Sequence, residues 1–155
     1  MALTLEQQRR YARQIQIAEF GENAQAKLLA ARVLVIGAGG LGAACISYLA
    51  AAGIGHLGII DHDRVELSNL NRQIIHETGD IGRLKAESAG DRVEELNPDV
   101  QVTLYPEKFT PANAAAIIAG YDLVLDGCDN FETRFIVNEA CIAQRKPLVS
   151  AAVRG

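Results

Sequence analysis

Cysteine is scarce and unpatterned in this chain of 155 residues. Cys45, Cys128 and Cys141 form neither a Cys-x-x-Cys pair nor a disulfide framework, which indicates a reducing compartment. Basic runs are also absent and the net charge is −4, so the sequence argues against a general nucleic-acid or anionic-membrane surface. There is no internal repeat and no low-complexity linker. We therefore expect a cytoplasmic protein that binds neither nucleic acid nor membrane.

No stretch of the sequence has the pattern of a membrane segment. The first ten residues lack the apolar core of a signal peptide. Residues 33–55 carry no charge, but they contain six glycines, each of which costs a helix interior about 1 kcal/mol relative to alanine. Lipid would offer the exposed backbone no other partner. The composition, 49% apolar and 22% charged, instead predicts a single globular domain.

The most informative stretch joins an apolar run to a cluster of glycines. Val33–Ile36 is short and rich in β-branched residues, which is typical of a strand buried on both faces of a parallel sheet. The run leads into Gly37, Gly39, Gly40 and Gly42. An alanine-rich stretch to Ala52 then predicts a helix, whose amino end favours an anion such as phosphate. The pattern predicts the strand–turn–helix of a nucleotide-binding α/β unit.

Strands and helices alternate along the rest of the chain. The Thr4–Gln7 spacing is that of a capping box and predicts a helix through about Gln14, with a second short helix at 24–30. Strands are expected at 56–61, 101–105, 122–126 and 147–153, and helices at 85–96, 111–120 and 131–144. The fold class is therefore α/β: a Rossmann-like three-layer sandwich with a mostly parallel sheet and its first strand central. Residues 1–31 would form a helical arm ahead of the sheet.

Polar residues gather where the carboxyl ends of the predicted strands meet. Asp61 ends the second strand and is placed to bind ribose, which does not by itself separate NAD from ATP. Arg72, in the long polar loop 61–73, and Lys85 favour a triphosphate, because its roughly four charges require cationic side chains and a divalent metal. Asp129 suits a Mg²⁺ ion that keeps most of its waters, although a plain helix N-cap explains it equally well.

Other reactive side chains receive no catalytic role. Cys128 lies beside two acidic residues, Asp126 and Asp129, whose charges raise the pKa of a thiol, so we do not expect a nucleophile. The other two cysteines fall in predicted helices and are expected to be small core residues. The histidines show no metal-ligand spacing and are assigned nothing: His56, His62 and His76.

Five ordered motifs together resemble the E1-like adenylyltransferases of the ThiF/MoeB/HesA type, which activate ubiquitin-like sulfur-carrier proteins. The motifs are Arg10-Tyr11-x-Arg13-Gln14-Ile15, Gly37-x-Gly39-Gly40-Leu41-Gly42, Asp61-x-Asp63-x-Val65-x-x-Ser68-Asn69-Leu70-x-Arg72-Gln73, Gly82-x-x-Lys85 and Asp126-x-x-Asp129-Asn130. That family normally continues with antiparallel strands and Cys-x-x-Cys zinc pairs. The resemblance therefore implies that residues 1–155 are an ATP-binding adenylation domain, the N-terminal part of a longer protein, with structural Zn²⁺ only in the part that follows.

The resemblance implies ATP and Mg²⁺ as cofactors, a ubiquitin-like sulfur carrier as partner, and a homodimer. In it Asp61 binds ribose, Asp129 binds Mg²⁺, and Arg13 reaches the γ-phosphate held by the other subunit. The implied catalytic residues are Arg72, Lys85, Asp129 and Arg13. The implied nucleotide-binding residues are Gly37, Gly39, Gly40, Gly42, Asp61, Asp63, Ser68, Asn69, Arg72, Gln73, Lys85 and Asn130.

The implied reaction is attack of the carrier's C-terminal Gly-Gly carboxylate on the α-phosphorus of ATP, which releases pyrophosphate, in thiamine or molybdopterin biosynthesis. A carboxylate is already ionised at pH 7 and needs no general base. Three alternatives remain: an NAD-dependent oxidoreductase, a non-catalytic nucleotide-sensing domain, and an E1-like enzyme that adenylates a carboxylate on a tRNA base. Arg72 and Lys85 stand against the first, and the net acidity counts against the last.

Overall fold

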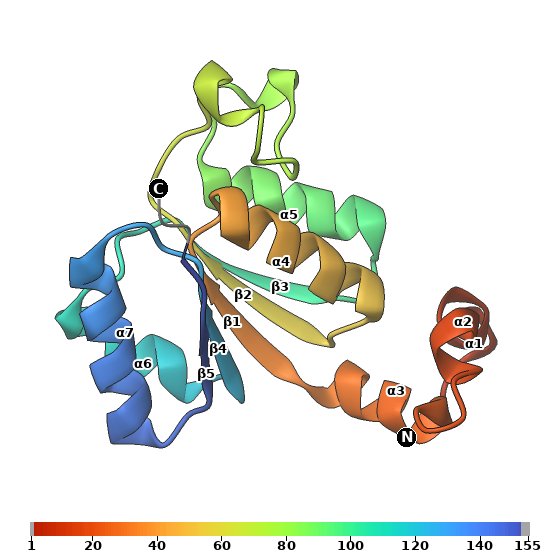
Figure 1. The fold of residues 1–155 in the computed structure, drawn as a ribbon. Coiled ribbons are helices and arrows are strands. Elements are labelled where there is room, and N and C mark those ends of the chain that lie inside the picture. Colours follow the sequence, from red (N-terminus) through yellow and green to blue (C-terminus); the bar gives the residue numbers. More distant parts are fainter. Residues whose placement is uncertain (1, 153–155) are drawn as a thin grey trace.

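Five parallel strands form the centre of the structure, a computed structural model that describes residues 2–152 (Figure 1). The strands are β1 (Arg32–Ile36), β2 (His56–Ile60), β3 (Gln101–Tyr105), β4 (Leu123–Asp126) and β5 (Leu148–Ser150). Their order in the sheet is β3-β2-β1-β4-β5. The predicted α/β sandwich, with the first strand central, is therefore confirmed.

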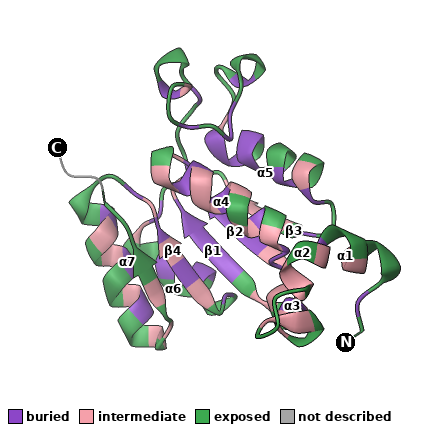
Figure 2. Ribbon diagram, turned by 45° about the vertical axis from the view of Figure 1, so that its right-hand side comes forward, coloured by how far each residue is buried: buried purple, intermediate pink, exposed green. Residues whose placement is uncertain are grey.

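Helices cover both faces of the sheet, as a right-handed parallel arrangement requires. They are α4 (Gly40–Ala52), α5 (Lys85–Leu96), α6 (Pro111–Ala119) and α7 (Phe131–Gln144), with two 3-10 turns, η1 (Leu67–Asn69) and η2 (Thr78–Asp80). Alternate residues of β1 pack on opposite sides: Val33 and Val35 on the side of α4 and α5, and Leu34 and Ile36 on the side of α6 and α7. Figure 2 shows the buried residues concentrated in the central strands and on the sheet-facing sides of the helices. Both faces of β1 are thus core, which explains its uninterrupted apolar sequence.

The register aligns the carboxyl ends of the central strands. Ile36, the last residue of β1, is opposite Ile60 of β2 and Asp126 of β4. The turns that follow these three strands consequently open at the same edge of the sheet, which is where parallel α/β folds bind their ligands.

A helical arm precedes β1: α1 (Leu5–Arg10), α2 (Ala12–Ile15) and α3 (Gly21–Ala30). The capping box is present as predicted, with the Gln7 amide donating to Thr4 Oγ1 at 3.1 Å. The single helix expected through this region is wrong, because the chain breaks at Tyr11. The Tyr11 ring is buried against Gly53, and its hydroxyl accepts from Asn97 Nδ2 at 2.8 Å. These tertiary contacts redirect the chain.

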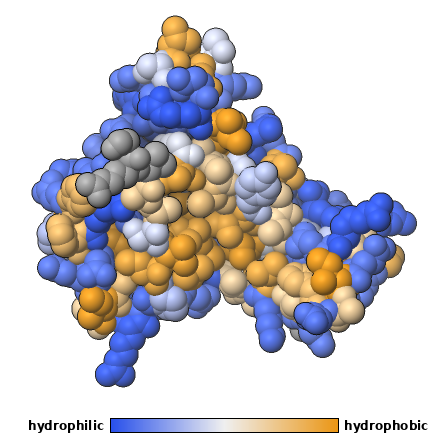
Figure 3. All heavy atoms as spheres, in the orientation of Figure 1, coloured by the Kyte–Doolittle hydropathy of each residue, from blue (hydrophilic) through white to orange (hydrophobic). Residues whose placement is uncertain are grey.

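The α4 side of the sheet is less completely covered near β5. Leu41, Cys45, Leu125 and Val149 border a shallow apolar hollow there, and Val149 is 53% exposed. Figure 3 shows a broad apolar area in the middle of this view of the molecule. The last strand ends at Ser150, earlier than predicted, and the predicted end at Val153 lies outside the described residues. No helix in the described part of the chain has the length and apolarity that crossing a bilayer requires.

Candidate functional site

A cavity of about 1040 Å³ opens at the carboxyl ends of the strands. The turn after β1 forms part of its wall, and the segments after β2, β3, β4 and β5 also contribute to it. Most of the residues selected from the sequence line it: Gly37, Gly39, Gly40, Asp61, Asp63, Arg72, Gln73, Lys85, Asp129 and Asn130. The structure therefore brings the glycine turn, both predicted cations and the predicted metal ligand together in one place.

Two glycines of the turn are required by its backbone. Gly37 has φ +91°, a left-handed conformation that side chains with a Cβ rarely adopt. A Cβ on Gly42 would lie 1.8 Å from the Gly37 carbonyl oxygen, so α4 packs directly against the turn. Gly42 thus has a packing role and does not line the cavity. Its absence of a side chain allows the amino end of α4 to approach the ligand space.

The side chain of Asp61 braces the turn from the end of β2. Its Oδ2 accepts from the Ala38 amide at 2.7 Å, and its Oδ1 accepts from the Asp63 amide at 2.8 Å. The residue is only 9% exposed. Each carboxylate oxygen keeps a lone pair after these bonds, so Asp61 holds the protein's own backbone and can still accept from a ribose hydroxyl.

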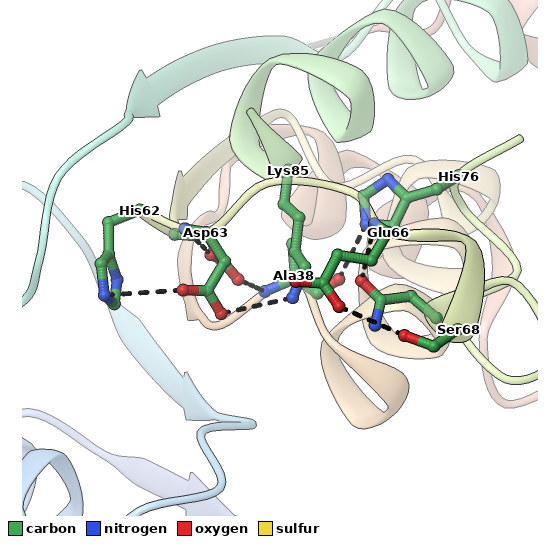
Figure 4. A network of polar contacts seen from close by, with 9 residues as sticks. Ala38, His62, Asp63, Glu66, Ser68, His76 and Lys85 are labelled. Atoms are coloured by element: carbon green, nitrogen blue, oxygen red, sulfur yellow. Dashed lines mark hydrogen bonds and ion pairs between the residues drawn. The ribbon is translucent and has the colours of Figure 1, made fainter. Parts of the chain in front are cut away.

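The carbonyl of Ala38 is held from the opposite side by His76 (Figure 4). His76 Nε2 lies 3.1 Å from that oxygen, and Nδ1 lies 2.8 Å from Ser88 Oγ. Burial lowers the pKa of His76 below its ordinary value, so the ring is neutral at neutral pH. The sequence assigned this residue no role, because its contacts join segments far apart in the chain and leave no local spacing to recognise.

Two cations stand beside the glycine turn. Lys85 is the first residue of α5, and its largely buried ammonium pairs with Asp63 Oδ2 at 3.3 Å (Figure 4). Arg72 is exposed, and its Nη1 donates to the Ser68 carbonyl and to Asn71 Oδ1, each at 3.0 Å. The Arg72 side chain also passes 3.8 Å from where a Cβ on Gly40 would lie. The side chain therefore lies next to the amino end of α4, where an anion would sit.

Two aspartates at the turn after β4 differ in role: one is hydrogen-bonded within the protein, and the other is available to a ligand. The buried Asp126 carboxylate accepts from the Cys128 amide at 3.0 Å and from Ser150 Oγ at 2.7 Å. Asn130 caps α7, with Oδ1 accepting from the Thr133 amide at 2.8 Å. The alternative in which Asp129 is the N-cap is therefore wrong. Within residues 2–152, the exposed Asp129 carboxylate has no hydrogen bond or ion pair, so it is available to a ligand.

Cys128 lines the cavity as a protonated thiol. Burial, followed by the neighbouring Asp126 carboxylate, raises the pKa of this thiol to about 12. At neutral pH almost no thiolate forms, and the thiolate is the reactive species. The pKa direction agrees with the expectation that Cys128 is not a nucleophile.

Four of the selected residues lie away from the cavity wall: Gly42, Ser68, Asn69 and Arg13. Ser68 and Asn69 instead close the short turn η1, since both make hydrogen bonds to Glu66. That turn leads into Arg72. Arg13 is exposed on α2, in the arm beyond the amino ends of the strands (Figure 1). It is therefore at the far end of the sheet from the cavity of its own chain.

Among the described residues, the cavity lining also includes two cations that the sequence analysis did not select, Lys108 and Arg134. Arg134 Nη2 donates to the Cys128 carbonyl at 2.8 Å and to the Ala151 carbonyl at 2.5 Å, so it ties the turn after β4 to the segment after β5. Lys108 pairs with Glu132 at 3.7 Å. Position could have indicated both, because Lys108 follows the carboxyl end of β3 and Arg134 lies in the first turns of α7.

The fold and the cavity together define a nucleotide-binding α/β domain: a glycine turn at a helix amino end, a buried aspartate after the next strand, and cations beside the turn. The ThiF family model matches residues 11–155, and the chain belongs to this family. Its E1-like character, predicted from the motifs, is therefore confirmed.

Relatives of known name are similar over nearly the whole chain. The chain is 49% identical over 152 residues to the probable adenylyltransferase/sulfurtransferase MoeZ of Mycobacterium tuberculosis, covering 98% of this chain and 39% of that protein. It is 46% identical over 153 residues to the sulfur carrier protein adenylyltransferase of Thermus thermophilus, covering 99% and 56%. The chain thus spans between about two fifths and just over half of the length of these relatives.

Solved structures share the same fold. The E. coli tRNA N6-threonylcarbamoyladenosine dehydratase TcdA, in complex with ATP, superimposes with a TM-score of 0.93 at 30% identity, covering 100% of this chain and 63% of that one. A complex of E. coli MccB with MccA-N7isoASN gives a TM-score of 0.82 at 28% identity, covering 92% and 44%.

Proposed function

We propose that this domain binds ATP and adenylates the C-terminal carboxylate of a ubiquitin-like sulfur-carrier protein of the ThiS/MoaD type. The observation that carries the proposal is the convergence of Arg72 and Lys85, from separate segments, on the cavity that the glycine turn borders. The relatives' names support adenylation of a sulfur carrier, and the TcdA complex supports ATP as the nucleotide.

The cavity suits a reaction that needs positioning and charge neutralisation and no protein nucleophile. The incoming carboxylate is ionised at neutral pH and attacks the α-phosphorus; the bond to the bridging oxygen breaks and pyrophosphate leaves. Backbone N–H groups at the start of α4, with Arg72 and Lys85, would hold the phosphates and neutralise the charge that grows on the leaving group. Asp61 would hold the ribose.

Mg²⁺ is the metal that fits this donor set. Asp129 offers a solvated carboxylate with no partner in the described part of the chain, at the wall of the cavity. One carboxylate plus phosphate oxygens and waters is the usual environment of protein-bound Mg²⁺. The ion would neutralise phosphate charge when bound.

A second copy of the chain would complete the site. Arg13 lies beyond the amino ends of the strands, so it reaches a nucleotide only in another subunit (Figure 1). A homodimer in which each arm supplies Arg13 to its partner gives this exposed cation a function and accounts for an arm that takes no part in the sheet.

Carrier-dependent exchange of labelled pyrophosphate into ATP tests the reaction. With a sulfur-carrier protein present, we expect exchange by the full-length protein that contains this domain and at least a hundredfold loss in Arg72→Ala and Asp129→Ala. Arg92→Ala is the matched control, because Arg92 is an exposed arginine of α5 that pairs with Glu95 and is not among the residues that line the cavity. Exchange that survives both cavity substitutions would remove the mechanism. Tight NAD binding without competition from ATP would favour the oxidoreductase.

A tRNA-directed activity is the second candidate, and the likeness to TcdA favours it. The same cavity could activate a carboxylate on a modified base. The two candidates separate in the exchange experiment: a carrier protein ending in Gly-Gly stimulates exchange under the first, and modified tRNA does so under the second. The net charge of −4 counts against binding of the polyanionic tRNA and favours the first.

A further inference from the structure

Both polar groups of one residue in the glycine turn are held by side chains outside the turn. The Ala38 amide donates to Asp61 Oδ2 at 2.7 Å, and the Ala38 carbonyl faces His76 Nε2 at 3.1 Å. Ala38 and His76 are buried, and neither lines the cavity. Among the described residues, no other hydrogen bond reaches the Ala38 oxygen. His76 is therefore the group that determines where this carbonyl points.

The direction of that carbonyl also determines the direction of the next amide. In a planar trans peptide the C=O of one residue and the N–H of the following residue point in opposite directions, and residues 2–152 contain no cis peptide. With the Ala38 carbonyl turned inward to His76, the Gly39 N–H is turned outward. Gly39 lines the cavity, and its N–H has no partner within the described part of the chain.

The contact between His76 Nε2 and the Ala38 carbonyl is a hydrogen bond in only one of the two neutral forms of the ring, the form with its proton on Nε2. Ser88 Oγ lies between His76 Nδ1 and Asp80 Oδ2, at 2.8 Å from each, and it has a single hydrogen. If Ser88 donates to Asp80, the one proton of neutral His76 must sit on Nδ1, and the buried Ala38 carbonyl loses its donor. If Ser88 donates to Nδ1, the proton sits on Nε2 and the carbonyl is held.

The second arrangement gives up the Ser88–Asp80 hydrogen bond but leaves both the Asp80 carboxylate and the Ala38 carbonyl bonded. Asp80 also accepts from the Glu77 amide at 3.0 Å and from Arg83 Nη1 at 2.7 Å, so it remains bonded without Ser88. The buried Ala38 carbonyl has no such substitute. The charged groups that face His76 are Asp80 from η2, Lys85 from the start of α5 and Asp61 from the end of β2. Their signs oppose one another, and burial keeps the ring neutral.

We propose that His76 is a positioning residue: with its proton on Nε2 it holds the Ala38 carbonyl and so directs the Gly39 N–H at the phosphates of the nucleotide. The inference rests on the proposed function for the identity of the ligand, ATP. In this proposal His76 contributes to phosphate binding without contacting the phosphates.

Two substitutions of His76 each preserve a different one of its two hydrogen-bonding positions. The amide nitrogen of glutamine can occupy the place of Nε2, whereas that of asparagine reaches only the place of Nδ1. His76→Gln should keep ATP affinity within about threefold, and His76→Asn should weaken it at least about tenfold, the loss expected for one hydrogen bond to a charged group. Adenosine affinity should change less than about twofold in both, because it has no phosphate. A merely structural defect would weaken adenosine and ATP alike.

Nitrogen NMR of the histidine-labelled chain supplies a readout that needs no substitution. In the ATP complex at pH 7.5 we expect His76 to be neutral with its proton on Nε2, and we expect Ser88→Ala to keep that form in the free protein, because the Ala38 carbonyl still accepts from Nε2. A ring protonated on Nδ1 in the ATP complex overturns the proposal. So does a folded His76→Asn variant with unchanged ATP affinity. Failure of the unmodified protein to bind ATP would instead overturn the proposed function.

Discussion

At the scale of single residues, one cation of the cavity, Lys85, is paired with an acidic side chain that also lines the cavity, Asp63. The Lys85 side chain is 9% exposed, whereas that of its partner Asp63 is 58% exposed. The two partners therefore differ in how much they depend on their 3.3 Å contact. Water can solvate Asp63 without Lys85, but a buried ammonium without a counter-ion carries a large desolvation cost. The pair is better described as support for Lys85 than as a source of stability.

Replacing each partner of this pair separately should give opposite results. Lys85→Met should change the free energy of unfolding by less than about 1 kcal/mol, because the remaining carboxylate is solvated, and should weaken ATP binding at least about tenfold. Asp63→Asn should lower the free energy of unfolding while keeping ATP affinity, because it leaves the ammonium and removes a negative charge. Denaturant titration and calorimetry measure both quantities. Equal loss of ATP affinity in the two variants would contradict a phosphate-binding role for Lys85.

The thiol of Cys128 should resist alkylation across the physiological range. Burial and Asp126 raise the pKa to about 12, so the group stays protonated until the pH approaches that value. Iodoacetamide at pH 8, followed by mass spectrometry, should modify Cys128 far more slowly than a free cysteine under the same conditions. Asp126→Asn removes a cause of the raised pKa and should speed the reaction. Rapid modification of Cys128 in the unmodified folded chain would show that the thiolate is accessible there.

At the scale of elements, the contact between α4 and the turn after β1 positions the helix amino end. Gly42 brings α4 against the Gly37 carbonyl, and Gly37 turns the chain at φ +91°. Gly37 and Gly42 therefore allow α4 to pack closely against the turn after β1. Gly39, in contrast, has φ −77°, which any residue can adopt, and a Cβ there would meet nothing closer than Gln73 Nε2 at 3.8 Å. Its small size matters only for a ligand.

Alanine at Gly42 and alanine at Gly39 should therefore have different effects, the first on the free energy of unfolding and the second on ATP affinity. Alanine usually stabilises a helix relative to glycine by about 1 kcal/mol, yet Gly42→Ala should lower the free energy of unfolding by at least about 2 kcal/mol, because its methyl group overlaps the Gly37 oxygen. Gly39→Ala should retain the stability of the unmodified chain and lose ATP affinity, since its methyl group enters the cavity. Thermal unfolding with and without ATP checks both. A stable Gly42→Ala variant would contradict the close packing of α4 on the turn.

At the scale of the whole molecule, the arm lies beyond the amino ends of the strands (Figure 1), whereas the cavity opens at their carboxyl ends. The arm is held there by polar contacts with the carboxyl ends of α4 and α5: Gln14 Nε2 donates to the Ala52 carbonyl at 3.2 Å and Arg10 Nη1 to the Leu96 carbonyl at 3.1 Å. Arg13, exposed on this arm, cannot serve its own cavity without losing these contacts. A role for Arg13 in binding must act between subunits.

Mixing two inactive variants tests the proposal that Arg13 of one subunit serves the cavity of the other subunit in a homodimer. Arg13→Ala and Arg72→Ala should each lose pyrophosphate exchange, and an equal mixture of the two should recover roughly a quarter of it, because half of the dimers are mixed and each of these has one intact site. Activity after mixing and equilibration is the measurement. No recovery in a mixture shown to form mixed dimers would place Arg13 and Arg72 in the same subunit's site. Full activity of Arg13→Ala alone would remove Arg13 from the mechanism.

Local patterns predicted most of the elements, and tertiary contacts account for the errors. The capping box at Thr4 and the start of α5 at Lys85 were predicted correctly, since both depend on neighbours within a turn of helix. The break at Tyr11 was missed because a distant asparagine and glycine produce it. His76 was missed for the same reason: its partners lie in other segments, and nothing in the adjacent sequence marks it.

The sequence by itself determined the alternation of strands and helices, the glycine turn and the membership of the E1-like class, because periodicity and ordered motifs are properties of neighbouring residues. Only the tertiary structure decided which polar groups are engaged and which are free. It assigned the cap of α7 to Asn130 and left Asp129 available, and it tied both polar groups of Ala38 to Asp61 and His76. Hydrogen-bond geometry depends on where distant segments meet, and that position is established only when the chain is folded.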